Sequence, residues 1–236
     1  MNDTVHGHMV QDLLRHRFGS HDNLICKYSS KYPVQAEREF QRLTNAYIRI
    51  LNELLKEYLP EIRDAARAEK EGQRHDDASD LIAKVKTVFS KMTVELERRT
   101  SMFGLRSKIE SMAKLTRKLS IREWKKAVKS TLGIDLMDDY YTGELYRTMM
   151  ERWVEDNVAL IKTIPQESLG RMRQIVLEGY RNGETTTAIV KQIQRAYSVD
   201  RRHAQLLARD QIAKLNGDIT QQQQQDAGVV EYVWST

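Results

Sequence analysis

The feature that most constrains this chain is the recurrence of an apolar residue at every third or fourth position over most of its length. This is the period of an α-helix that buries one stripe, whereas a half-buried strand alternates every second residue. Only 11 Gly and 3 Pro occur among 236 residues, so few residues interrupt the pattern. The spacing therefore predicts a mainly α protein.

In the first half of the chain, the stripe predicts a long helix over residues 34–70 and a second helix over 78–99. The two should pair as an antiparallel hairpin. Pro60 is expected to bend or break the first helix, because proline removes a hydrogen bond and collides with the preceding turn. Further along, Ser120 and Glu123 have the spacing of a capping box, which predicts the start of a new helix.

In the second half, Pro165 is expected to stop one helix and to lie in the first turn of the next. Ser198 should cap a last long helix, after a shorter one over 185–197. Beyond Gly228, residues 229–236 (VVEYVWST) are rich in strand-favouring side chains and predict a terminal β-strand.

These elements predict three regions: a flexible N-terminal arm over 1–33, a long-helix hairpin region over 34–133, and a compact helical unit over 134–236 that ends in the strand. A lone strand leaves its backbone groups unpaired and is not stable by itself. Its partner could be residues 24–28, another copy of the chain, or a C-terminal segment that this sequence lacks. We expect the last region to be truncated.

Charge is distributed unevenly along the chain, whose net charge is +5. The segment from Arg98 to Lys129 contains eleven Lys or Arg and two Glu, which gives it a net charge of +9. The residues from 135 to 156 have a net charge of −5. A basic stretch can bind the phosphate backbone without reading sequence, although it can also be a solvated helix surface. The DNA-binding candidates are Arg106, Lys108, Lys114, Arg117, Lys118, Arg122, Lys125, Lys126 and Lys129.

Several classes of site are not expected. A single cysteine, Cys26, excludes an internal disulfide framework, and no apolar run reaches the roughly 18 residues of a membrane span. No Gly-rich phosphate loop, nucleophile elbow or metal-ligand spacing of histidines is found in the sequence. We therefore predict no catalytic residue, no metal and no cofactor, and expect folding in the cytoplasm where the chain is made.

Four pieces of the C-terminal part stand in a characteristic order. They are Trp153, Asn157, Leu160, Ile161, Ile164 and Pro165, then Gly183 and Ile189, then 204–210 (AQLLARD, ending in Arg209 and Asp210), and last Thr220, Gly228, Tyr232 and Trp234. In this order and spacing they resemble the phage head morphogenesis family, the Mu-F-like minor head (minor capsid) proteins. The likeness covers about 80 of 236 residues and contains no catalytic signature.

The resemblance implies a virion protein in few copies, inside the head near the portal, that contacts the portal and other capsid proteins during head assembly and DNA packaging or delivery. Packaged double-stranded DNA and a second copy, bound through the C-terminal strand, are further candidate partners. Family members usually continue beyond the position of Trp234 into a segment with a histidine and an Asp-Gly pair, which is missing here. Two alternatives stay open: a sequence-independent DNA-binding protein, and the helical scaffold of an enzyme whose active site lies in that missing segment.

Two further groups of residues allow a structural and a binding interpretation. Arg209 and Asp210 are adjacent and point to different sides of their helix, so we expect one of them to anchor the helix to its neighbours or to the terminal strand. Met149, Met150 and Trp153 could form a docking surface for the portal, because methionine and aromatic side chains adapt well to partners. Core packing is the more ordinary interpretation of these three residues.

Overall fold

The structure is a computed structural model that describes residues 26, 28–71, 78–102, 104–133, 135–136 and 143–229. The described residues form α-helices and contain no strand, so the prediction of a mainly α protein is confirmed. The predicted strand over 229–236 lies outside the described residues, apart from Val229 at its start. Most of its proposed partner, 24–28, also lies outside them.

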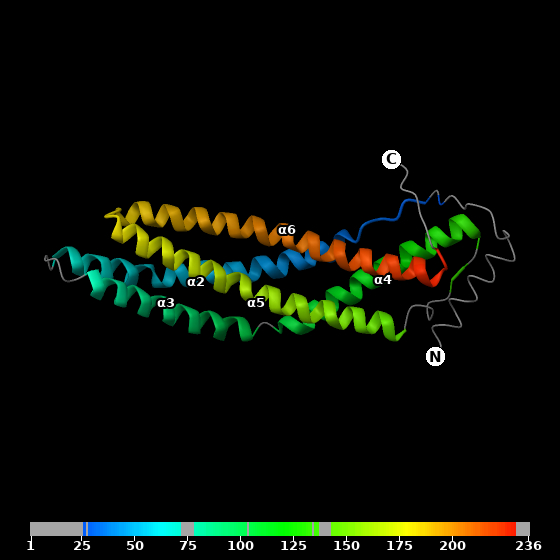
Figure 1. Ribbon diagram of the computed structural model, residues 1–236, viewed down its shortest axis with the longest axis horizontal. Coiled ribbons are helices and arrows are strands. Elements are labelled where there is room, and N and C mark those ends of the chain that lie inside the picture. Colours follow the sequence, from blue (N-terminus) through cyan, green and yellow to red (C-terminus); the bar gives the residue numbers. More distant parts are fainter. Residues whose placement is uncertain are drawn as a thin grey trace. The chain divides into compact units, whose positions relative to one another are not determined.

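The helices are, in chain order, α2 (Val34–Glu71), α3 (Ala78–Ser101), α4 (Leu105–Leu132), α5 (Glu144–Arg181) and α6 (Thr186–Asp226) (Figure 1). Glycines with left-handed backbone follow α4, α5 and α6, with φ of 66° at Gly133, 69° at Gly183 and 75° at Gly228. A glycine adopts this conformation without steric cost and lets the next amides bond to the last carbonyls of a helix. Gly133, Gly183 and Gly228 therefore mark the ends of these three helices.

The two prolines expected to interrupt helices lie inside continuous ones, Pro60 in α2 and Pro165 in α5. The prediction that Pro165 stops a helix is wrong. Of the two outcomes expected at Pro60, a bend or a break, the break does not occur. A proline removes only one backbone hydrogen bond, and packing of the apolar face provides most of the stability of a helix in a protein. The buried stripe continues on both sides of Pro165, through Ile161 and Leu169.

The two predicted helix starts at serine are also wrong. Ser120 lies within α4 and is buried, and the Glu123 carboxylate of the supposed capping box is bound to residues of another segment. Ser198 lies within α6, where its hydroxyl donates to the Gln194 carbonyl at 3.0 Å. Serine side chains can bond to backbone groups inside a helix as well as at its start, so the local pattern is ambiguous.

The described chain divides into two compact units that are both discontinuous in sequence. Unit 1 takes its residues from 1–39, 107–156 and 209–236, and unit 2 takes its residues from 40–106 and 157–208. Neither coincides with the predicted ranges 34–133 and 134–236. The difference arises because α2, α5 and α6, and α4 through its first two residues, each supply residues to both units.

In unit 2, α2 and α3 lie side by side and antiparallel, as predicted (Figure 1). Glu57 of α2 pairs with Arg99 of α3, whereas Glu61, further along α2, pairs with Lys91, earlier on α3. One apolar core joins these helices to the parts of α5 and α6 in this unit. Its fully buried members include Leu51, Leu54, Val85, Met92, Met172 and Val176.

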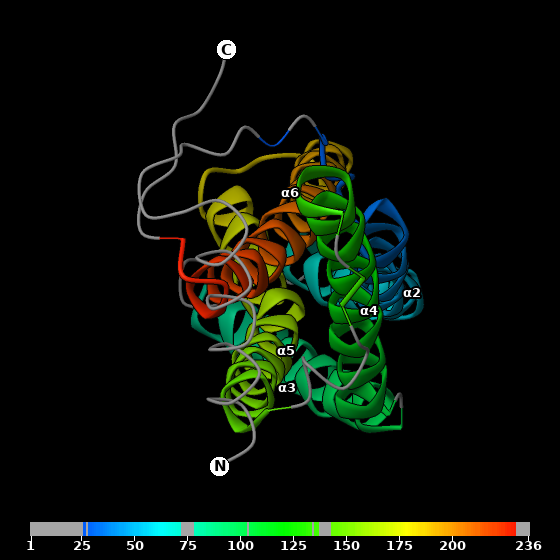
Figure 2. The ribbon, with the colours of Figure 1, turned by 90° about the vertical axis from the view of Figure 1, so that its right-hand side faces the viewer.

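Unit 1 contains nearly all of α4, the first part of α5 and the last part of α6 (Figure 2). Two hydrogen bonds join α5 to α6. The Trp153 indole donates to the Gln211 carbonyl at 3.1 Å, and the Tyr146 hydroxyl donates to the Asp226 carboxylate at 3.0 Å. These contacts also run in opposite directions along the two helices, so α5 and α6 pair antiparallel in this unit.

Candidate functional site

The exposed side of α4 is strongly basic. Its 28 residues include nine Lys or Arg and two Glu, which gives the helix a net charge of +7. The basic residues are the nine predicted candidates, of which seven are exposed while Arg117 and Lys125 are half-buried. Arg106 belongs to unit 2 and the other eight belong to unit 1.

Part of this charge is compensated within the chain. Lys126 pairs with Glu123 at 2.9 Å, and Lys129 pairs with Asp135 at 3.0 Å. Lys114 and Lys118, by contrast, have no hydrogen bond or ion pair to any residue that the structure describes. These two lysines are therefore the basic residues of α4 with the least competition for an external anion.

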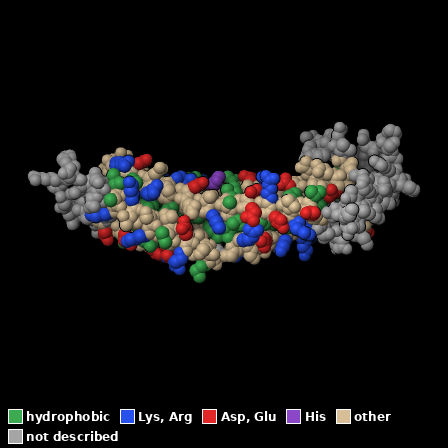
Figure 3. Space-filling view, turned by 60° about the horizontal axis from the view of Figure 1, so that its bottom comes forward, with side chains coloured by type: hydrophobic (Ala, Val, Ile, Leu, Met, Phe, Trp, Pro, Cys, Tyr) green, Lys and Arg blue, Asp and Glu red, His purple; other side chains and the backbone are tan. Residues whose placement is uncertain are grey.

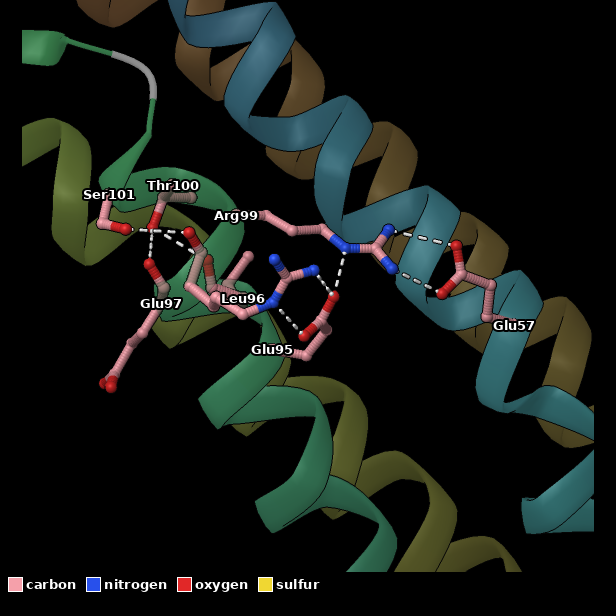
Figure 4. Close-up of polar contacts among 8 residues, drawn as sticks. Glu57, Glu95, Leu96, Glu97, Arg99, Thr100 and Ser101 are labelled. Carbon is pink, nitrogen blue, oxygen red and sulfur yellow. Dashed lines mark hydrogen bonds and ion pairs between the residues drawn. The ribbon is translucent and has the colours of Figure 1, made fainter.

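Arg98 and Arg99 belong to a different arrangement, although they are part of the same basic stretch of sequence. Arg99 donates to Glu57 and to Glu95, both at 2.7 Å, and thereby bridges α3 to α2 within unit 2 (Figure 4). Arg98 donates to both oxygens of Glu95. Hydrogen bonds from Arg98 and Arg99 lower the pKa of Glu95 to about 2, so the group stays ionised and neutralises local positive charge.

One face of the molecule carries charged side chains of both signs. Figure 3 shows Lys and Arg side chains interleaved with Asp and Glu on one face of the molecule. A mixture of this kind is typical of a solvated helical surface. The excess of positive charge is largest on α4 among the described helices, because α3 and α6 each carry a net charge of +2.

Glu123 is a site that sequence reasoning missed. Its side chain is only 4% exposed. It accepts hydrogen bonds from the Tyr28 hydroxyl at 2.6 Å and the Lys31 backbone amide at 3.1 Å, besides its contact with Lys126. Burial alone would raise the pKa of Glu123, but these hydrogen bonds together lower it to about 2. The buried carboxylate thus holds residues 28–31 against α4.

The residues of the family resemblance meet in two places. In unit 1, Trp153 is buried and its indole bonds to the carbonyl of Gln211, directly after the AQLLARD piece. In unit 2, Ile164 and Ala204 pack together with Ile48 in a small apolar cluster. Pieces that lie 40 or more residues apart in the sequence therefore form contacts between α5 and α6 within each unit.

The other residues of the resemblance have varied surroundings. Asn157 and Pro165 are buried, and Gly183 and Gly228 end helices. The Arg209 and Asp210 side chains are exposed, and it is the backbone carbonyl of Arg209 that accepts a hydrogen bond from the Tyr32 hydroxyl at 3.1 Å. Tyr232 and Trp234 lie outside the described residues.

The methionine-rich segment at the start of α5 is mainly part of the core. Met150 and Trp153 are 9% and 5% exposed, and Met149 is half-buried. Side chains so deeply buried cannot reach a partner without rearrangement, so core packing is the interpretation that fits this segment.

The described residues contain no group of three or more His, Cys, Asp or Glu side chains placed to hold a metal ion. Within the same part of the chain, none of the helices combines the length and apolarity that crossing a bilayer requires.

Comparison with known proteins gives little guidance on function. No family model matches the chain, and no solved structure matches it. An uncharacterized protein of Haemophilus influenzae is 27% identical to it over 108 residues, which are 46% of this chain and 24% of that protein. The match thus spans about a quarter of that protein's length.

Proposed function

We propose that the chain is a structural minor head protein of a phage, which acts inside the head near the portal vertex during assembly and DNA packaging or delivery. The order and spacing of the four C-terminal pieces support the family. Within that role, α4 supplies a basic surface for packaged DNA.

The observation that carries the structural role is the placement of the resemblance residues in helix contacts. Trp153 bonds to Gln211, and Ile164 packs on Ala204, so these residues hold α5 against α6. The resemblance residues Trp153, Ile164 and Ala204 are thus buried between helices, where they stabilise the fold. This supports a protein that works through its shape and surface.

The test of this function is co-purification with the portal protein encoded in the same phage genome. The two proteins are co-expressed, the portal is tagged, and the lysate is treated with nuclease before capture. We expect the chain to remain bound to the portal after DNA is removed. Loss of the chain on nuclease treatment would instead favour the alternative of a sequence-independent DNA-binding protein.

The contact with DNA is tested through Lys114 and Lys118, which have no partner among the described residues. Each neutralised phosphate adds about 0.9 to the slope of log affinity against log salt concentration. Lys114→Glu combined with Lys118→Glu should therefore reduce this slope by about 2 on duplex DNA. The matched control is Lys162→Glu with Lys191→Glu, the same charge change at exposed lysines of α5 and α6. Equal slopes for the two double variants would contradict binding through α4.

Co-purification with the portal separates the two contacts. The Lys114 and Lys118 double variant should still be captured with the portal after nuclease treatment, because the proposed portal contact does not depend on DNA. Loss of both capture and DNA binding in this variant, with an unchanged helix content, would show one shared basic surface in place of two separate contacts.

A further inference from the structure

Unit 1 contains a polar cavity of about 140 Å³ beneath the segment that leads into α2. Its walls come from that segment, from α4 and from the last turns of α6. The lining residues are Ser30, Lys31, Tyr32, Ser120, Glu123, Trp124, Asn216, Thr220 and Gln223. One ordered water needs roughly 10–15 Å³ of such space, so the cavity has room for a molecule of several non-hydrogen atoms.

Two lining side chains have buried polar atoms without a hydrogen-bond partner among the described residues. Gln223 is completely buried, and neither its Oε1 nor its Nε2 atom is bonded. The indole Nε1 of Trp124 is likewise buried and unbonded. Burial of a polar group is unfavourable unless a partner replaces the lost water, so these atoms are groups for which a partner is expected.

The unbonded atoms define the chemistry of that partner. The Gln223 amide presents an acceptor and a donor side by side, and the Trp124 indole adds a second donor. Their complement is a carbonyl next to an N–H group. The Glu123 carboxylate on the same wall is already bonded to Tyr28, Lys31 and Lys126, and its negative charge disfavours an anion.

We propose that this cavity is a binding site for a small neutral amide, recognised by the Gln223 side chain and the Trp124 indole. Residues 28–32 close the cavity on one side. They are held there by the bonds from Tyr28 and Lys31 to Glu123, and by the bond from Tyr32 to the Arg209 carbonyl. The site is independent of the basic side of α4 and of the role in the phage head.

The experiment is a titration of the full chain with N-methylacetamide, followed by the indole N–H signals in ¹H–¹⁵N spectra. Trp124→Phe assigns the signal of Trp124. We expect this signal to shift with saturation in the unaltered protein, and N,N-dimethylacetamide, which lacks the N–H donor, to bind at least about tenfold more weakly. Gln223→Met should abolish the saturable shift, whereas Gln221→Met, at an exposed neighbour in α6, should leave it unchanged.

A second measurement separates a binding role of Gln223 from a structural one. If its amide lacks a protein partner, Gln223→Met should raise the melting temperature of the ligand-free protein, by roughly 2–4 °C. A lower melting temperature would overturn the proposal, because Gln223 would then be bonded within the protein. The proposal would also be overturned if the Trp124 indole signal shifted linearly with concentration and equally for N-methylacetamide and N,N-dimethylacetamide. The cavity would then hold only water.

Discussion

Replacement of Glu123 by glutamine is expected to lower the free energy of unfolding of unit 1 at pH 7 and to have a much smaller effect near pH 3. Glutamine keeps the size of the side chain but removes its charge and one of its acceptors. The Tyr28 hydroxyl, the Lys31 amide and the Lys126 ammonium all bond to the carboxylate, so at least one of them loses its partner.

The size of the effect follows from the pKa of Glu123, which is lowered from 4.5 to about 2. At 1.36 kcal/mol per unit, this shift corresponds to at most about 3 kcal/mol. Lys126 is half in solvent, which weakens its share. The glutamine carbonyl can still accept from both Tyr28 and Lys31, because these two donate to the same carboxylate oxygen. We therefore expect a loss of about 1–2 kcal/mol at pH 7.

The pH dependence has a definite sign. A carboxyl whose pKa is lowered by folding stabilises the folded state fully above its ordinary value, and that contribution disappears as the pH falls toward the pKa of the folded state. For Glu123 this window extends from about 4.5 down to about 2. The unaltered protein should thus lose its advantage over Glu123→Gln between these two pH values.

The measurement is urea unfolding at pH 7, 5 and 3, followed by the fluorescence of Trp124 and Trp153, which both lie in unit 1. The control is Glu151→Gln, at an exposed position of α5 in the same unit. The control variant should unfold like the unaltered protein at each pH. A Glu123→Gln deficit of the same size at pH 7 and pH 3 would show that the substitution acts through packing and not through the ionised carboxylate.

Two other substitutions test the packing of α5 on α6. Gly179→Ala should lower the free energy of unfolding by about 1–3 kcal/mol, because the added methyl group would lie 2.6 Å from the Ile189 side chain. The control is Gly170→Ala in the same helix, where the methyl group would have nothing within 4 Å. This control should raise the free energy of unfolding by up to about 1 kcal/mol. Thermal melting followed by circular dichroism compares the two. Trp153→Phe removes the bond to the Gln211 carbonyl and should cost about 0.5–1.5 kcal/mol in urea unfolding, and a cost of zero would show that this bond does not hold the helices together.

The helices α2 and α3 could be predicted from the sequence because their apolar stripes are local signals. The predicted 34–70 and 78–99 agree with α2 and α3 to within two residues at each end. In these helices the buried stripe both defines the length and supplies the contacts that stabilise it, as Leu54 and Met92 in the core of unit 2 illustrate.

The wrongly predicted helix boundaries lie where a residue that favours a helix end or start is outweighed by tertiary packing, which cannot be read from the local sequence. Pro165 and Ser198 favour helix boundaries, yet α5 and α6 continue through them because apolar faces are buried on both sides. The division into two units could not be predicted from boundaries along the chain, since four of the five described helices contribute to both units.

The candidate sites also differ in how far the sequence could predict them. The basic side of α4 was predictable because its lysines and arginines are close together in sequence. The role of Glu123 was not, because its partners Tyr28 and Lys31 are 95 and 92 residues away and the carboxylate has the spacing of a capping residue. Gln223 looked like one polar residue in a glutamine run, and only its complete burial distinguishes it.

The proposed role as a structural part of the phage head can be tested by quantitative mass spectrometry of purified phage particles, with an isotope-labelled copy of the chain as standard. A minor head protein should be present in a small, constant number of copies per particle and should be retained when tails are removed from the heads. If the chain is present in the infected cells but absent from the particles they produce, it is not a structural part of the head.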